Sequence, residues 1–507
     1  MIKNIKYLLF ASLTLMACSS DDDSGESVAE VPITSGEADF STYVALGNSL
    51  TAGYSDNALF RAGQENSFAK LLADQFALAG GGEFKIPYTN DNVGGLLLGG
   101  NMIAGPRLVF NGVGPVPLPG GVPTTEIGVP LSGPFNNLGV PGAKSFHLLA
   151  PGYGDVTGVA TGTANPYFVR FRSSPTASVI EDAMAQQPTF FSLWIGNNDV
   201  LGYATTGGDG TNPITDTGLF NTYYNTLITT LTSAGAKGVV ANIPDVVDIP
   251  HFRTVPYNPL SPANPAFGPM IPTLNQTFGQ LNQAFTFLGV PERSIVFSTT
   301  APSAMVIHDE SLPNISVQLA QVLQAANVPG AAVLANQFGQ ARQATAADLF
   351  VLPAQTVIAT LNQPYFNFLM SQGVPAEMAG QLSVNGITYP LQDKWVLLPS
   401  EQQEITTATA AFNAIIQQAA DAKGLAFVDA NGLLRQLANG GIRFGNYHMS
   451  SSFAVGGAFS LDGIHLSARA NAYVANKFVD AINAQYGSTL RKYGPENFSG
   501  QYAADLP

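Results

Sequence analysis

The segment TFFSLWIG, Thr189 to Gly196, is a continuous apolar run with the length of one β-strand. A strand that is apolar at nearly every position fits a parallel sheet, where helices bury both faces. YYNTLITTLTSAG, Tyr223 to Gly235, follows with apolar residues at helical spacing and a terminal glycine, and GVVANIP, Gly238 to Pro244, is a second buried run. Strand, helix and strand in this order predict a βαβ unit, and therefore an α/β sheet with helices on both faces.

The same alternation of strands and helices extends outward from this unit in both directions. Further segments with a strand or helix pattern are YVAL (43–46), NSFAKLLADQFALA (66–79), EQQEITTATAAFNAIIQQAADAKG (401–424), LAFVDA (425–430) and LDGIHLSARANAYVANKFVDAINAQYG (461–487). Residues 83–135 are rich in glycine and proline, so we expect long loops there. Residues 251–395 break the rhythm with many prolines, and we expect them to form an insertion, either an extra subdomain or a cap.

The composition of the chain restricts its class of function. The 507 residues are 46% hydrophobic and only 11% charged, which allows a large core and a surface of mostly uncharged polar side chains. The net charge is −14 with 21 lysines and arginines, and no basic run occurs. Because nucleic-acid binding needs a basic surface, we expect no nucleic-acid partner.

The first eighteen residues have the layout of a secretory signal. Lys3 and Lys6 precede the apolar run YLLFASLTLMA, which ends at Cys18. The stretch LMAC, residues 15–18, resembles the bacterial lipobox, in which the cysteine is lipidated and becomes the new N-terminus. Cys18 is the single cysteine of the chain and has no disulfide partner within it. We therefore expect residues 1–18 to be a lipoprotein signal peptide; the alternative is an ordinary cleaved signal with an unrelated cysteine.

Residues 19–38 are polar, acidic and without periodicity, which predicts a flexible tether. Within them SDDD, residues 20–23, resembles the acidic tag with which Bacteroidota send lipoproteins to the cell surface; a plain solvated linker is the alternative. No other apolar run reaches the length of a membrane-spanning helix without polar, glycine or proline breaks. We expect an exported outer-membrane lipoprotein that is exposed at the cell surface and held to the membrane by its lipid anchor.

The turn GNSL, Gly47 to Leu50, joins the strand YVAL to a helical segment. Serine at the start of a helix is a favoured N-cap, because its hydroxyl accepts a hydrogen bond from a free backbone N–H. A serine in the same place becomes a nucleophile when a neighbouring base removes its proton. The turn by itself leaves both interpretations of Ser49 open.

Three more short blocks lie at strand ends or helix starts, where ligand sites gather in open α/β sheets: NLGVPG (137–142), GNND (196–199) and DGIH (462–465). Of five histidines, only His465 has a carboxylate three residues upstream in a turn that opens a helix. From that spacing Asp462 can hold one ring nitrogen while the other faces Ser49, as the carboxylate of a catalytic triad does. Taken alone, Asp462 is also explained as a helix N-cap and His465 as a first-turn residue.

Acyl transfer also needs hydrogen-bond donors where the oxyanion develops. Ser49 at a helix start can offer its own N–H, supported by the helix dipole. Gly142, which follows a proline in a tight turn, has no Cβ and can bring its N–H close to a substrate. Asn198 offers a side-chain NH₂ group. In isolation, Gly142 is also explained as a turn glycine and Asn198 as a loop residue.

Ser49, Gly142, Asn198 and His465 in this order, with Asp462 three residues before the histidine, resemble the GDSL/SGNH hydrolase family. The resemblance implies a flavodoxin-like three-layer α/β/α fold and hydrolysis of esters or thioesters without a metal or organic cofactor. It implies that Ser49 is the nucleophile, that Asp462 and His465 complete the triad, and that Ser49, Gly142 and Asn198 form the oxyanion hole.

The resemblance divides the chain into parts. The hydrolase core is expected in two stretches, 39–250 and 396–490, with the insertion 251–395 between them and a C-terminal tail at 491–507. One position departs from the family pattern, since the family's aspartate in the first block is Asn48 here. Both residues can cap the turn, so we expect its geometry to be kept with one charge fewer. The G-x-S-x-G motif of conventional α/β-hydrolases would need glycine at Thr51, which argues against that class.

The remaining polar groups are expected to be structural. His147, His251 and His308 lack a second ligand at metal spacing. In the loop GGDGTNPITDTG, Asp209, Asn212 and Asp216 carry oxygens of the kind that binds Ca²⁺, but their spacing is not that of an EF-hand. Asp429, at the end of LAFVDA, is expected to be a structural residue or to lie at the rim of the site.

Two classes of ester are open as substrates. The apolar, proline-rich insertion and the low surface charge favour lipid-like acyl esters, which makes a lipase the first expectation. The alternative is an esterase that removes acetyl groups from polysaccharide, although only two tryptophans, Trp194 and Trp395, are present to stack on sugars. A third hypothesis is a surface binding lipoprotein with a vestigial site.

Overall fold

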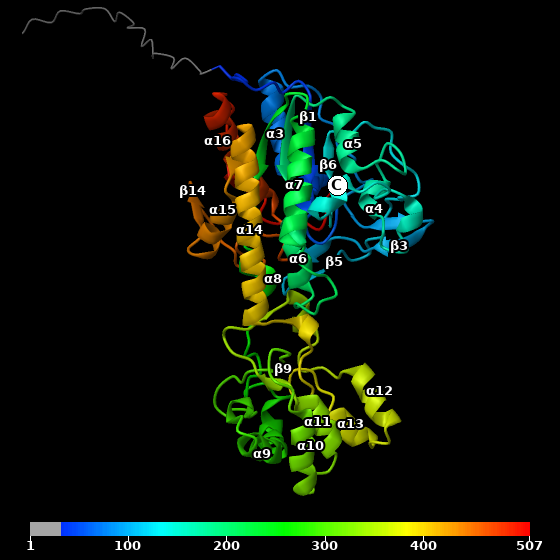
Figure 1. The fold of residues 1–507 in the computed structure, drawn as a ribbon, viewed down its shortest axis with the longest axis vertical. Coiled ribbons are helices and arrows are strands. Elements are labelled where there is room, and N and C mark those ends of the chain that lie inside the picture. Colours follow the sequence, from blue (N-terminus) through cyan, green and yellow to red (C-terminus); the bar gives the residue numbers. More distant parts are fainter. Residues whose placement is uncertain (1–31, 507) are drawn as a thin grey trace, which may run out of the picture. The chain divides into compact units, whose positions relative to one another are not determined.

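A parallel sheet of five strands forms the centre of the computed structural model, which describes residues 32–506 (Figure 1). Its strands are β1 (Tyr43–Gly47), β6 (Asn137–Gly139), β7 (Phe190–Trp194), β8 (Lys237–Ala241) and β13 (Ala426–Val428). The spatial order is β13-β8-β7-β1-β6, and every neighbouring pair is parallel. The predicted α/β class and the βαβ unit are therefore confirmed. Cys18 and the expected signal peptide lie outside the described residues.

Helices cover both faces of this sheet. The helices of the sheet region are α1 (Ser49–Ala52), α2 (Arg61–Glu65), α3 (Phe68–Leu78), α4 (Pro166–Val169), α5 (Val179–Met184), α6 (Asn197–Thr205), α7 (Thr217–Leu231), α14 (Pro399–Lys423), α15 (Ala430–Ala438) and α16 (Ala468–Tyr486). Alternate residues of each strand point to opposite faces, so Tyr43 and Ala45 pack with α3 and α16, whereas Val44 and Leu46 pack with α5, α7 and α14. Each face of the sheet thus has its own helix layer and its own hydrophobic cluster.

The segment 83–135 is more ordered than the predicted long loops. It contains two small hairpins, β2 (Leu96–Leu98) with β3 (Asn101–Ala104) and β4 (Leu108–Phe110) with β5 (Pro115–Pro117). Gly99 and Gly100 join β2 to β3, both with positive φ, which is the conformation that a two-residue hairpin turn needs. Glycine-rich sequence was interpreted as loop here, although a Gly-Gly pair between apolar residues is a hairpin signal.

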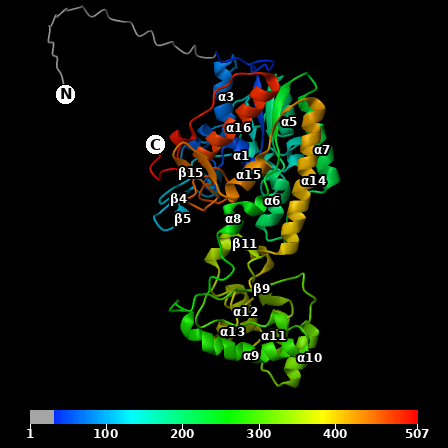
Figure 2. The ribbon, with the colours of Figure 1, turned by 90° about the vertical axis from the view of Figure 1, so that its left-hand side faces the viewer.

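Residues between β8 and α14 fold into a separate group of short elements. These are α8 (Pro250–Arg253), α9 (Ile271–Phe287), β9 (Val306–His308), α10 (Ser316–Ala325), α11 (Ala331–Phe338), β10 (Ala341–Gln343), β11 (Leu349–Phe350), α12 (Gln363–Ser371), α13 (Ala376–Gln381) and β12 (Val396–Leu397). In both views α9 to α13 lie together, apart from the sheet and its helices (Figures 1 and 2). β14 (Ile442–Phe444) and β15 (Tyr447–Met449) form a further hairpin after α15.

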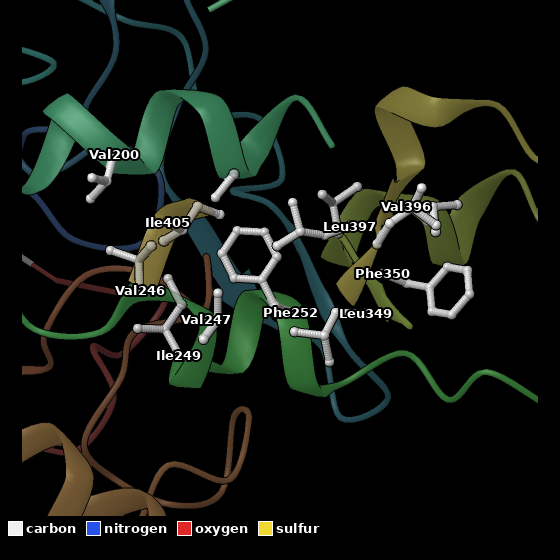
Figure 3. Packing of buried hydrophobic residues seen from close by; sticks show 14 of the residues in the cluster. Val200, Val246, Val247, Ile249, Phe252, Leu349, Phe350, Val396, Leu397 and Ile405 are labelled. Atoms are coloured by element: carbon white, nitrogen blue, oxygen red, sulfur yellow. The ribbon is translucent and has the colours of Figure 1, made fainter. Parts of the chain in front are cut away.

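Apolar side chains join this group to the sheet region. Phe252 of α8 and Leu349 of β11 belong to the same buried cluster as Val246 and Ile405 (Figure 3). Short 3-10 helices complete the described secondary structure at Ser145–Leu149, Val156–Gly158, Val246–Asp248, Gly268–Met270, Pro291–Arg293, Leu352–Thr356, Asp393–Trp395 and Pro495–Asn497. Within residues 32–506, none of the helices combines the length and the hydropathy that crossing a membrane requires.

Candidate active site

Ser49 is the first residue of α1, directly after the turn that ends β1. The turn needs glycine at position 47, because a Cβ there would lie 2.2 Å from the Thr51 Oγ1 and 2.5 Å from the Trp194 carbonyl oxygen. The alternative interpretation of Ser49 as the N-cap is wrong: Asn48 is the N-cap, and its side-chain oxygen accepts a hydrogen bond from the Leu50 N–H at 3.0 Å. Since Asn48 already holds the helix start, the Ser49 hydroxyl is left for other partners.

The hydroxyl of Ser49 forms one end of a chain of hydrogen bonds to His465 and Asp462. Ser49 Oγ lies 2.8 Å from His465 Nε2, and His465 Nδ1 lies 2.8 Å from Asp462 Oδ2. A carboxylate only accepts hydrogen bonds, so Nδ1 carries the ring proton and Nε2 is free to accept from the serine. The structure therefore brings together three residues that stand 416 and 3 positions apart in the sequence.

Asp462 is held in its ionised form by its surroundings. Burial by itself would raise the pKa of this carboxyl, but its electrostatic interaction with the His465 imidazole and the hydrogen bonds from that residue's ring and backbone lower the pKa well below the usual range. Oδ1 accepts from the Ile464 N–H at 2.8 Å, the His465 N–H at 2.9 Å and the Ser460 hydroxyl at 3.0 Å. Oδ2 also accepts from the Asn57 N–H at 2.9 Å. These donors fix both oxygens in space.

The DGIH block is a closed turn and not the start of a helix. The Ser460 N–H donates to the His465 carbonyl at 2.8 Å, and the Gly463 N–H donates to the Ser460 carbonyl at 3.0 Å. α16 begins at Ala468, and its N-cap is Ser467. The alternative interpretations of Asp462 as an N-cap and His465 as a first-turn residue are therefore wrong, because the Asp462 oxygens accept hydrogen bonds from its own turn and from the imidazole.

The expected oxyanion donors lie around the same serine. Ser49, Gly142 and Asn198 line one open pocket of about 340 Å³. Gly142 has a φ of +82°, a conformation that side chains rarely adopt, and its neighbour Pro141 is fixed by a hydrogen bond from Asn165 Nδ2 to the Pro141 carbonyl at 2.8 Å. Asn198 donates one amide hydrogen to the Ala143 carbonyl at 2.9 Å, which leaves its second amide hydrogen for a ligand.

Two residues that the sequence analysis missed tie these donors together. The buried carboxylate of Asp199 accepts from the Ser145 N–H at 2.8 Å and from the Ser145 hydroxyl at 2.7 Å. Burial raises the pKa of Asp199, and the two bonds from Ser145 oppose that rise. The two hydrogen bonds from Ser145 to Asp199 connect the turn that contains Gly142 to the helix that contains Asn198. The signal was present, since Asp199 belongs to the GNND block and Ser145 stands three residues after Gly142.

A second pocket, which is apolar, also reaches Ser49. Its walls come from the start of α1 and α6, the ends of β7 and β13, the segment after β8, α15, the β14–β15 hairpin and the start of α16. Among the described residues, none from 251–395 lines either pocket at Ser49. The side chains that surround the nucleophile thus come from the two stretches of chain on either side of the insertion.

The other polar groups singled out in the sequence lie elsewhere. His147 stacks on Tyr153, and burial lowers its pKa to about 4. His308 lies in β9 of the insertion, and Asp429 is the N-cap of α15, where it also accepts from Asn242. His251 is buried, with its backbone N–H bonded to the Gly463 carbonyl at 3.0 Å. None of these side chains reaches Ser49.

The three residues of the loop that offered calcium ligands have hydrogen-bond partners within the protein. Asp209 accepts from Thr211, Asn212 accepts from Lys144, and Asp216 is the N-cap of α7. Within residues 32–506, the acidic groups close enough to share an ion are Glu310, Asp393 and Glu401, whose oxygens lie within 4.8 Å of one another. Burial and neighbouring carboxyls raise the pKa of Asp393 to about 7, and they raise the pKa of Glu401 as well.

Comparison of the chain with protein-family descriptions, with curated proteins and with solved structures finds no match. The geometry at Ser49 therefore carries the functional argument.

Proposed function

We propose that the protein is a serine carboxylic-ester hydrolase of the SGNH type. The observation that carries the proposal is the unbroken chain from Ser49 Oγ through His465 to Asp462, with both hydrogen bonds at 2.8 Å. A buried and ionised carboxylate orients the imidazole, and the imidazole accepts from the hydroxyl. This arrangement activates the hydroxyl as the nucleophile of acyl transfer. The donors of Gly142 and Asn198 on the same pocket supply the place for an oxyanion.

The residues act in two steps. Ser49 Oγ attacks the ester carbonyl while His465 Nε2 takes its proton, and the N–H of Ser49 and the donors of Gly142 and Asn198 stabilise the oxyanion. His465 then gives the proton to the departing alcohol oxygen, which leaves an acyl group on Ser49. Water loses a proton to His465 and attacks this ester, and the acid leaves as the proton returns to Ser49. Asp462 stays ionised and stabilises the imidazolium in both steps.

The fold supports the SGNH assignment. Numbered along the chain, the five strands lie in the order 2-1-3-4-5, which is the flavodoxin-like order. Ser49 follows the end of the first strand, and Asn198 follows the end of the third. In such sheets ligands bind beyond the carboxyl ends of the strands, at the point where the strand order reverses, between the first and third strands.

We also propose that Cys18 anchors this enzyme to the outer membrane.

Covalent labelling tests the assignment of Ser49. A fluorophosphonate probe should modify the wild-type protein at the peptide that contains Ser49, and Ser49→Ala should lose both the label and all ester turnover. Ser41→Ala, an exposed serine on the same segment, is the matched control and should keep both. Labelling elsewhere, or turnover that survives in Ser49→Ala, would show that the site assignment is wrong. A protein that neither labels nor hydrolyses esters would instead fit the binding lipoprotein with a vestigial site.

An acylated glycan is the second candidate substrate, and one feature of the insertion favours it. A surface pocket of about 660 Å³ there is lined by Tyr365, Phe368 and Tyr389 together with the amides of Gln372 and Gln392. Aromatic faces beside amide groups suit sugar rings. Deacetylation of acetylated polysaccharides, measured as released acetate beside hydrolysis of long-chain esters, separates the two candidates.

A further inference from the structure

Apart from the aromatic Trp194 and Tyr473, the hydrogen-bonding side chains that line the apolar pocket belong to Ser49 and to residues near it in the sequence or in the hydrogen-bond network. Those residues are Asn48, Ser49, Asn197, Asn198 and His465. They form one linked group, because Asn48 donates to Asn197 at 3.2 Å and His465 bonds Ser49. The rest of the lining is aliphatic or aromatic. A ligand that enters from the nucleophile therefore leaves polar contacts behind and meets hydrocarbon.

α15 supplies the longest apolar wall. Ala430, Leu433, Leu434 and Leu437 all line the pocket, and their spacing of three, four and seven residues places them on one face of the helix. Gln436, on the flank of the helix beside Leu433, is exposed and does not line the pocket. Met449 of the β14–β15 hairpin and Ile442 close the pocket next to Leu437, and both are buried. This wall is built from core-like side chains that still leave a space beside the nucleophile.

The space suits a thin chain. Its volume is about 100 Å³, and since one water-sized group needs about 10–15 Å³, the pocket holds roughly seven to ten such groups. A sugar ring or a peptide would lose its water partners there without finding new ones. An unbranched hydrocarbon loses nothing by leaving water and gains by burial. The more open pocket on the other side of Ser49, with Tyr54, Asn57 and Thr205 in its lining, can take the polar part of a substrate.

We propose that the apolar pocket binds an unbranched hydrocarbon chain of the ester substrate, with room for roughly seven to ten methylene-sized groups. The chain belongs to either the acyl or the alcohol side of the ester, and the inference rests on the proposed function only for the statement that the ligand is an ester. The β14–β15 hairpin and α15 set the length of chain that is accepted.

Binding of a fatty acid tests the pocket without any catalysis. Trp194 lines the pocket, and Trp395 is the only other tryptophan, so the full chain carrying Trp395→Phe reports on Trp194 alone. Decanoate should change the Trp194 fluorescence to saturation, and acetate should not. Leu437→Phe should weaken decanoate binding about fifteenfold, because the larger ring takes about two methylene places at about fourfold each. Gln436→Phe, at an exposed position of the same helix, should bind decanoate as the parent does.

Ester turnover identifies the source of the chain. Hydrolysis of methyl acetate, methyl octanoate and octyl acetate is followed by acid release at constant pH. A kcat/KM that rises about fourfold per methylene along the methyl ester series assigns the pocket to the acyl chain, and the same rise along the alkyl acetates assigns it to the alcohol. If Leu437→Phe does not fold, Leu433→Phe, at a less buried wall position, takes its place in the decanoate titration.

The outcomes separate the two proposals. Absence of saturable decanoate binding, or equal kcat/KM values for all three esters, overturns the pocket assignment even if the protein is an esterase. Decanoate binding without hydrolysis of any ester leaves the pocket assignment intact and shows that the proposed catalytic function is wrong.

Discussion

Replacement of Asp462 by asparagine tests the role of this carboxylate at nearly constant shape. The new side chain keeps one oxygen and replaces the other by an NH₂ group. If Oδ1 remains the oxygen, it keeps its three donors from Ser460, Ile464 and His465. The NH₂ group then faces His465 Nδ1 and the Asn57 N–H. In the reversed orientation the NH₂ group would face three hydrogen-bond donors instead of two, so the first orientation is favoured.

In that orientation the imidazole must change its tautomer. Nδ1 can bond the new NH₂ group only as an acceptor, so the ring proton moves to Nε2 and points at the Ser49 hydroxyl. His465 then cannot take the serine proton during attack. The equivalent exchange in a measured serine protease lowers kcat about 10⁴-fold, which is about 5.5 kcal/mol of barrier. We expect Asp462→Asn to lower kcat for a short-chain ester by about this factor, with KM little changed.

The assay compares kcat and KM for p-nitrophenyl acetate in the wild type, Asp462→Asn and a control. Asp216→Asn is the control, because Asp216 also accepts two backbone N–H groups through Oδ1 but caps α7 away from Ser49. It should keep wild-type kcat. Circular dichroism and thermal unfolding show whether Asp462→Asn is folded. A folded variant that keeps kcat within about tenfold of the wild type would refute the tautomer argument and the triad assignment.

Two further predictions concern an oxyanion donor and a buried histidine. Asn198→Ala should lower kcat for p-nitrophenyl acetate by roughly 10²–10³, as loss of one oxyanion donor does in a measured case, and an unchanged kcat would remove Asn198 from the oxyanion hole. Burial lowers the pKa of His251 to about 4. The unfolded state therefore binds the extra proton between pH 6.5 and 4, so this group's contribution to stability is complete above pH 6.5 and falls by about 3 kcal/mol as the pH drops to 4. Urea unfolding at pH 7.5 and pH 4.5 should show that His251→Gln loses less stability on acidification than the wild type, and equal losses would contradict the prediction.

Local sequence patterns were sufficient for most of the sheet region. The mostly apolar run that became β7 and the amphipathic stretch that became α7 are recognisable from the sequence, because strand and helix periodicities are properties of neighbouring residues. The hairpin at Gly99-Gly100 was missed because glycine-rich sequence was interpreted as loop. The arrangement of the elements in the insertion could not be predicted from the sequence, because most of these elements are short and are held by contacts with distant segments.

The site divides in the same way. The sequence by itself determined which residue types the site contains: a serine at a strand end, an aspartate three residues before a histidine, and a glycine and an asparagine in turns. It did not determine that Asn48, and not Ser49, caps α1, because two adjacent residues can both cap and only the backbone geometry selects one. It also left open whether Asp462 would turn to the imidazole or to a helix end.

Only the tertiary structure decided that Ser49 and His465, 416 residues apart, lie 2.8 Å from each other. It also decided that an apolar pocket begins at the same serine, because the walls of that pocket combine α1 and α6, which precede the insertion, with α15, the β14–β15 hairpin and α16, which follow it. The physical reason is that a catalytic distance and a cavity both depend on how separate elements pack. Periodicity and motif spacing describe each element alone and carry no information on that packing.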